Sequence, residues 1–169
     1  MANQSEKNPL EKIPPHSLEA EESLLGSLLI DKDAIIRVVD SILPQDFYKD
    51  AHKIIFETIK ELYGNQEPID IITLSNRLEE RKQLTNIGGR TFLAHLSNVV
   101  ATSANIVNYA NIIQRKATLR RLQQAASEIM TISYDEERDI DEVLDETEKK
   151  IFAVSRKYLK NAFLPIDSL

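Results

Sequence analysis

The chain has 169 residues, enough for one hydrophobic core, and its 42% hydrophobic and 28% charged content is ordinary for a globular protein. The absence of cysteine excludes disulfides, thiolate catalysis and zinc–sulfur sites. The net charge of -6 argues against nucleic-acid binding by the whole surface, though not against a local basic patch. Because the sequence has no membrane-spanning apolar run and no apolar signal core at its start, we expect a cytoplasmic protein without a membrane partner.

The first half of the chain predicts a small helical head after a polar arm. Residues 1–15 are polar and end in two prolines, which favours a flexible N-terminal arm. Residues 16–102 show helical periodicity broken by proline and glycine, and strand signals are absent, so we expect a globular all-α head. Its predicted helices cover about residues 18–30, 33–43, 46–63, 71–81 and 90–99. Gly26 lies inside the first helix, as either a close helix crossing or a tolerated defect.

Residues 103–158 predict a long antiparallel helical hairpin. No glycine or proline occurs from Arg90 to Leu164, and a short polar turn divides two helices at about residues 103–132 and 139–158. At ~1.5 Å per residue the first helix would be about 45 Å long, too long to remain inside the head. The short turn returns the second helix beside the first. Residues 159–169 resemble the start of a further element.

The apolar pattern of the hairpin predicts which surfaces it covers. In its first helix, one apolar face at residues 106–117 is expected to dock on the head, and a nearly opposite face at residues 119–129 to meet the returning helix. The second helix shows a narrow seam at Ile140, Leu144, Thr147, Ile151, Val154 and Tyr158. Further apolar residues lie off this seam, which indicates pairing with another chain's hairpin; the alternative is a hairpin folded onto its own head. The candidate self-association residues are Leu119, Leu122, Ile129, Leu144, Ile151, Phe152 and Val154.

Charge is separated along the hairpin. Residues 135–148 contain nine acids and one base, whereas residues 115–121 and 149–160 contain bases and no acid. An antiparallel hairpin places the acids at its tip and the bases at its base. This pattern fits either a solvated surface or an electrostatic guide for docking. The candidate docking residues are Arg115, Lys116, Arg120, Arg121, Arg156 and Lys157.

No catalytic, cofactor-binding or metal-binding motif is present in the sequence. Neither the GxxxxGK[ST] nor the GxGxxG phosphate-binding pattern occurs. The three histidines, His16, His52 and His95, lack metal-ligand spacing and are expected to be structural or exposed. We therefore expect no enzyme active site in this chain.

Six ordered segments resemble the N-terminal domain of the bacterial replicative DNA helicase, the DnaB family. They cover about residues 14–155 and read PPHSLEAEESLLGSLLID, DFYKDAHKIIFETIKEL, PIDIITLSNRL, IGGRTFLAHL, ANIVNYANIIQRKATLRRL and ETEKKIFAVS. The resemblance implies a head with a hairpin that pairs between subunits, in a collar of six copies built as a trimer of dimers. It also implies docking of primase and possible contact with a helicase loader.

The same resemblance places catalysis outside these residues. It implies that residues 159–169 begin a linker to a C-terminal ATPase domain, which would hold ATP and magnesium. DNA contact is expected to be weak, or to require the full-length ring. An alternative interpretation of the residues alone is a generic helical oligomerisation or adaptor module without a role in replication; a nucleic-acid-binding module is a third.

Overall fold

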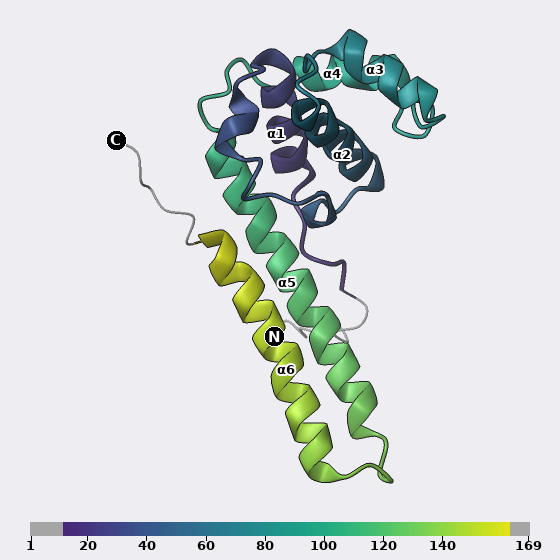
Figure 1. Cartoon of the computed structure of the whole chain (residues 1–169), viewed down its shortest axis with the longest axis vertical. Coiled ribbons are helices and arrows are strands. Elements are labelled where there is room, and N and C mark those ends of the chain that lie inside the picture. Colours follow the sequence, from purple (N-terminus) through teal and green to yellow (C-terminus); the bar gives the residue numbers. More distant parts are fainter. Residues whose placement is uncertain (1–11, 163–169) are drawn as a thin grey trace, which may run out of the picture.

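The computed structural model describes residues 12–162 and is entirely helical over that range, with no strand (Figure 1). The helices of the head are α1 (Leu18–Ile30), the short 3-10 helices η2 (Ala34–Arg37) and η3 (Pro44–Asp46), α2 (Asp50–Gly64), α3 (Ile71–Glu80) and α4 (Gly89–Ser97). The hairpin consists of α5 (Ile106–Ser133) and α6 (Ile140–Ala162). The predicted all-α class, with a helical head and a projecting antiparallel hairpin, is confirmed.

Parts of the predicted chain organisation lie outside the described residues. These are residues 1–11 of the expected arm and residues 163–169 of the expected linker. Within residues 12–162, none of the helices combines the length and the apolar character needed to cross a membrane.

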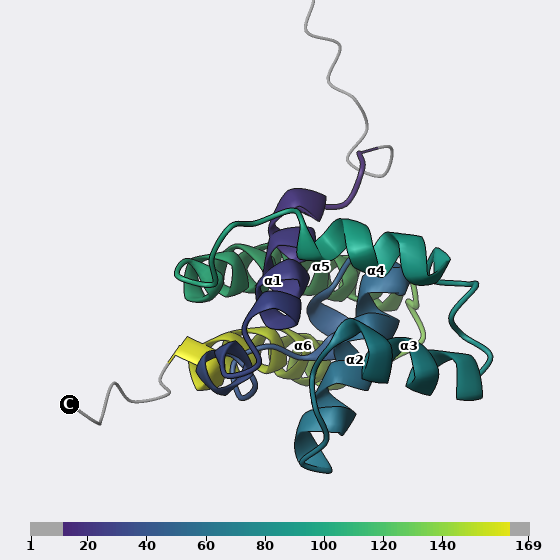
Figure 2. The ribbon, with the colours of Figure 1, turned by 90° about the horizontal axis from the view of Figure 1, so that it is seen from above.

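The head is built around α1, which packs against α2, α4 and α5 (Figure 2). Leu24, Leu25 and Leu28 of α1 are completely buried. Their spacing places three large side chains toward the other helices, so that a short helix contributes to one shared core. The other completely buried large side chains come from four elements and one loop: Ile42, Ile55, Phe56, Ile59, Leu62, Leu74, Leu78, Leu93, Leu96 and Ile106.

The segment expected to be an α-helix at residues 33–43 is shorter and tighter in the structure. Only Ala34–Arg37 are helical, in a 3-10 turn, and backbone turns follow as far as Ser41. Ile35 and Val38 are buried while Ile36 is 63% exposed. The apolar residues of this stretch therefore do not all fit the inner face of one helix, and the short turns allow Ile42 to reach the core as well.

A carboxylate from α1 caps the start of α2. The buried Glu21 accepts hydrogen bonds from the backbone N–H of Tyr48 at 2.7 Å and of Lys49 at 3.4 Å. It also lies 2.7 Å from Nδ1 of the fully buried His52. The N-cap residue of α2, Lys49, makes no side-chain capping bond of its own. Glu21 thus supplies the negative charge and the acceptors that this helix start requires.

Gly26 marks the close crossing of α1 and α4. A β-carbon at this position would clash with the backbone carbonyl oxygen of Leu96. Of the two explanations left open by the sequence, the close helix crossing is therefore the one that the structure supports.

We predict that Gly26→Ala lowers the free energy of unfolding by about 1–3 kcal/mol, because the added methyl group forces α1 and α4 apart. Gly64→Ala is the matched control, since a β-carbon there meets nothing within 4 Å. Thermal and urea unfolding followed by circular dichroism measures both variants. Equal stability of the two would contradict the close packing described here.

Candidate self-association surface on the hairpin

The first half of α5 attaches the hairpin to the head. Ile106, Ala110, Ile113 and Ala117 are buried, and α5 packs against α1, η2 and η3. The predicted docking of this face on the head is confirmed. Spacings of four and three residues place the four side chains on one side of the helix, so the head fixes the rotation of α5 about its own axis.

Two arginines at the base of the hairpin bind the head. Arg121 forms an ion pair with Asp46, whose side chain is fully buried and whose other oxygen accepts the backbone N–H of Leu43 at 2.9 Å. Arg120 donates to the carbonyl oxygens of Pro15, at 2.7 Å, and of Asp46, at 2.6 Å. Burial lowers the pKa of both guanidinium groups. These two candidate docking residues are therefore engaged within the chain.

An aromatic stack extends this junction. The guanidinium of Arg120 lies 5.7 Å from the ring centre of Tyr48, and the rings of Tyr48 and His16 stack at 4.1 Å. The segment before α1, the loop before α2 and the middle of α5 therefore meet at one place. Nothing in the spacing of Asp46, Tyr48 and Arg120 in the sequence indicated that they would come together.

The seam between α5 and α6 consists of small and polar side chains. On α6, the half-buried positions are Val143, Glu146, Thr147, Lys150, Val154 and Lys157. On α5, Ala125 is buried, and Arg121 and Glu128 line the same groove as Lys150 and Lys157. Lys150 pairs with Glu128 at 2.8 Å across the seam. Burial, together with the charge of Arg121, lowers the pKa of Lys157.

The predicted seam of α6 is wrong at four of its six positions, and only Thr147 and Val154 are half-buried against α5. Ile140, Leu144, Ile151 and Tyr158 are exposed by 66%, 57%, 47% and 47% instead of facing α5. The expected change of face on α5 is also wrong. Leu119 and Leu122, which were expected to meet α6, are 39% and 48% exposed, and Ala126 is exposed as well.

These two predictions fail because a single face of α5 contacts both the head and α6. The side that packs on the head continues through Ala117, Arg121, Ala125 and Glu128, with spacings of four, four and three residues. Along this side, α5 packs first against the head and then against α6. Because the buried first half sets the rotation of α5, the leucines of its second half are turned away from α6.

The displaced apolar side chains gather on one side of the hairpin. At ~100° per residue, Leu122 and Ile129 lie roughly 80° from the centre of the seam on α5, and Leu144 and Ile151 lie roughly 90° from it on α6. Both rotations run in the same direction when each helix is viewed from its own N-terminus. In an antiparallel pair of helices, equal rotations of this kind bring the side chains to the same side of the pair. We call this surface, formed by Leu119, Leu122, Ile129, Ile140, Leu144, Ile151 and Tyr158, the apolar side.

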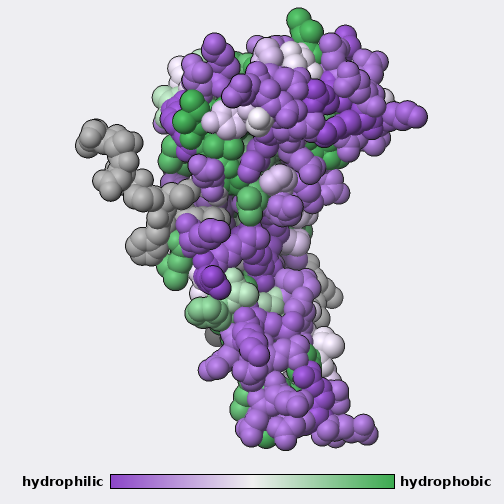
Figure 3. All heavy atoms as spheres, viewed as in Figure 1, coloured by the Kyte–Doolittle hydropathy of each residue, from purple (hydrophilic) through white to green (hydrophobic). Residues whose placement is uncertain are grey.

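The remaining self-association candidates lie elsewhere on α6. Val154 is half-buried in the seam against α5. Phe152 is 65% exposed on the outer edge of α6, where it lines an open groove of about 510 Å³ with Ile151 and charged neighbours. In Figure 3, the visible face of the hairpin is mostly hydrophilic, and separate apolar side chains interrupt it.

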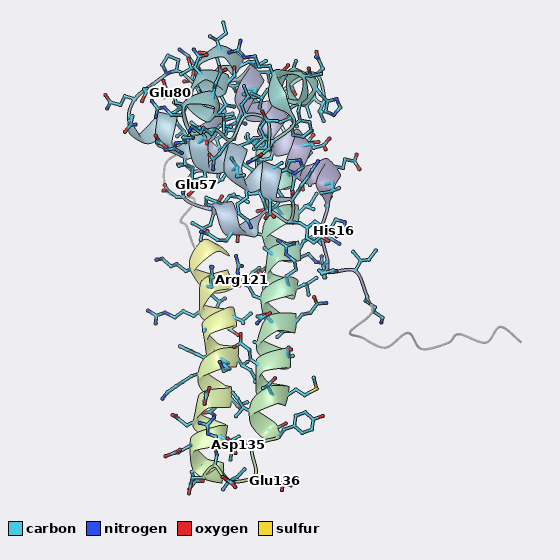
Figure 4. All side chains as sticks on the ribbon, turned by 90° about the vertical axis from the view of Figure 1, so that its right-hand side faces the viewer. His16, Glu57, Glu80, Arg121, Asp135 and Glu136 are labelled. Carbon is cyan, nitrogen blue, oxygen red and sulfur yellow. The ribbon has the colours of Figure 1, made fainter. Side chains whose placement is uncertain are left out.

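Charge is divided between the two ends of the hairpin. Figure 4 shows Arg121 near the head, and Asp135 and Glu136 at the far tip. Among the candidate docking residues, Arg115 and Arg156 are exposed, and Lys116 and Lys157 are half-buried. The bases of the tip half are paired with acids, as in Arg138–Glu146 at 2.8 Å and Lys149–Asp145 at 2.6 Å.

The described residues contain no group of three or more histidine, aspartate or glutamate side chains arranged to hold a metal ion. Their most buried polar feature is the Glu21–His52 pair in the head. One local pattern indicates the burial of Glu21, which lies at the helical spacing of the inward-facing Leu24, Leu25 and Leu28.

A family model described as "DnaB-like helicase N terminal domain" matches residues 13–115, well over half of the chain. The chain belongs to the DnaB family. Its resemblance to the N-terminal domain of the replicative helicase, predicted from the sequence, is thereby confirmed.

Two curated relatives support this assignment. The replicative DNA helicase DnaB of Geobacillus stearothermophilus is 38% identical over 159 residues, which cover 94% of this chain and 35% of that protein. The replicative DNA helicase DnaB of Mycobacterium leprae is 38% identical over 158 residues, covering 92% of this chain and 26% of that protein. The chain thus spans about a third or less of these relatives.

Solved structures show the same fold. The N-terminal domain of DnaB helicase from Mycobacterium tuberculosis matches with a TM-score of 0.79 and 39% identity, covering 84% of this chain and 99% of that one. A DnaB-like replicative helicase, from a structure described together with its interactions with primase, matches with a TM-score of 0.69 and 19% identity. That match covers 83% of this chain and 31% of the other, and it supports the fold alone. The DnaB N-terminal fold therefore includes most of the hairpin as well as the head.

We predict that Asp46→Ala lowers the free energy of unfolding by about 2–3 kcal/mol, because it leaves the half-buried Arg121 without its counter-charge and the Leu43 N–H without its acceptor. The double variant Asp46→Ala/Arg121→Ala should recover part of this loss, since it removes the uncompensated charge. Chemical unfolding of the single and double variants measures the coupling. Strictly additive losses would show that the pair does not hold the hairpin to the head.

Proposed function

We propose that this chain is the collar module of a replicative helicase, which assembles through its hairpins and provides a docking platform for primase during DNA replication. Membership of the DnaB family supports the replication role. The observation that carries the assembly role is the apolar side of the hairpin, where large apolar side chains of both helices face outward although the seam between the helices is small and polar.

The apolar side fits a second copy of this chain. Single soluble domains rarely expose a continuous apolar surface of more than a few hundred Å². Here, exposed leucine, isoleucine and tyrosine side chains follow both helices from Leu119 and Tyr158 at the base to Ile140 at the tip. Two such hairpins placed face to face would form a four-helix arrangement with these side chains in its core.

Higher assembly and further partners follow from the family. We propose a hexamer built as a trimer of dimers, with contacts to primase and to a helicase loader, and with DNA bound weakly or only by the full-length ring. The structure described together with its interactions with primase is that of a DnaB-like relative, and it makes primase the first partner to test. We assign no catalytic, ATP-binding or metal-binding role to these residues and place ATP hydrolysis in the remainder of the helicase.

We predict that Leu122→Asp and Ile151→Asp each shift the protein from dimer or higher assembly to monomer, because each buries a carboxylate in the proposed interface. Light scattering at a series of concentrations measures the mass. Ser127→Asp is the matched control, since Ser127 is exposed and lies roughly 140° around α5 from Leu122. Circular dichroism must show a folded head in every variant. An unchanged mass in both apolar variants would rule out pairing through this side.

We predict that the chain binds primase of the same organism at micromolar concentrations, whereas a generic helical adaptor would not. Isothermal titration calorimetry of the two purified proteins measures the interaction, with serum albumin as the control for non-specific association. Absence of binding at the highest soluble concentration would favour the adaptor alternative, even if the hairpins pair.

A further inference from the structure

α6 differs from the other α-helices of the described chain in having no buried side chain. Each of α1 to α5 contributes at least two residues to the buried set, whereas residues 140–160 of α6 contribute none. Its principal packing partner is α5. α6 carries half of the apolar side. It is therefore the α-helix whose side chains are least buried by the rest of its own chain.

The contacts that hold α6 against α5 are individually weak. The seam-facing apolar residues of α6 are two valines, Val143 and Val154, both only half-buried. The cross-seam ion pair between Lys150 and Glu128 has side chains that are 27% and 43% exposed, and exposed pairs of this kind contribute little to stability. The seam therefore removes little apolar surface from water for the number of residues that it orders.

Ion pairs in α6 offset repulsion between its own acids. Asp141 and Asp145, and likewise Glu142 and Glu146, are four residues apart, where like charges repel along a helix. Glu146 is compensated by Arg138 at 2.8 Å and Asp145 by Lys149 at 2.6 Å. Helical segments in water are marginal without tertiary packing of an apolar face, and the largest apolar side chains of α6 face away from α5.

We infer that α6 is ordered by self-association: it remains docked on α5 as a helix when a second hairpin covers its apolar side, and opens locally in the single chain. This inference rests on the proposed self-association and specifies its mechanism, since closing the hairpin and pairing two hairpins become one coupled equilibrium. The first half of α5 is not part of the opening, because Ile106, Ala110, Ile113 and Ala117 hold it on the head.

Hydrogen exchange of the full chain, followed by mass spectrometry, tests the coupling. Leu122→Asp is the informative variant, because it lies on α5 and leaves the sequence of α6 unchanged. We expect the backbone amides of residues 143–158 to exchange at least ~100-fold faster in this variant than in the assembled wild-type chain. The amides of α2 around Ile55 and Ile59 should be unaffected, and Ser127→Asp should behave as the wild-type chain. Dilution of the wild-type chain below the dissociation constant of its self-association should reproduce the effect.

The outcomes separate this inference from the proposed function. A Leu122→Asp chain that is monomeric by light scattering but protects α6 as strongly as the assembled wild-type chain would overturn the coupling and leave hairpin pairing intact. A wild-type chain that remains monomeric at every concentration would overturn the proposed pairing and the coupling with it. Loss of protection in α6 that follows the loss of mass, with α2 unchanged, would establish the coupling.

Discussion

The rotation of α5 about its own axis determines which side chains of the hairpin are buried and which are exposed. The head fixes that rotation, because Ile106, Ala110, Ile113 and Ala117 must all point into the core. A helix without glycine or proline transmits the rotation along its length, so the same side continues through Arg121, Ala125 and Glu128 and receives α6. The leucines of the second half of α5 are exposed because this rotation turns them away from α6. The burial of one end of a helix thus leaves apolar side chains exposed at the other.

The junction between the head and the hairpin is held by polar contacts, whereas the core of the head is apolar. Asp46, fully buried, holds Arg121, and Arg120 binds two backbone carbonyl groups. A buried charge that loses its partner is costly, so such a network strongly favours one arrangement of its members. The direction in which the hairpin leaves the head is therefore set by packing along α5 and by these bonds together.

Local sequence signals predicted the elements better than their contacts. Proline, glycine and capping residues located the head helices, and the long stretch without helix breakers located the hairpin. The assignment of faces failed because a period of 3.6 residues identifies apolar stripes but not their partners. Ile151 and Leu144 form as regular a stripe as Val154 and Val143, and only the three-dimensional position of α5 decides between them. Gly26 and Glu21 make contacts with residues far along the chain. The spacing of Glu21 from the inward-facing leucines of α1 indicates that it is buried, but no local pattern identifies its partners.

The carboxylate of Glu21 has a consequence for how the head folds. The start of α2 has no acceptor from its own neighbourhood and takes one from α1, about 30 residues earlier in the sequence. The first turn of α2 therefore cannot reach its final stability as a local event, because it needs α1 to be in place. The two helices are expected to appear in the same kinetic step, which makes this pair a natural nucleus for the folding of the head.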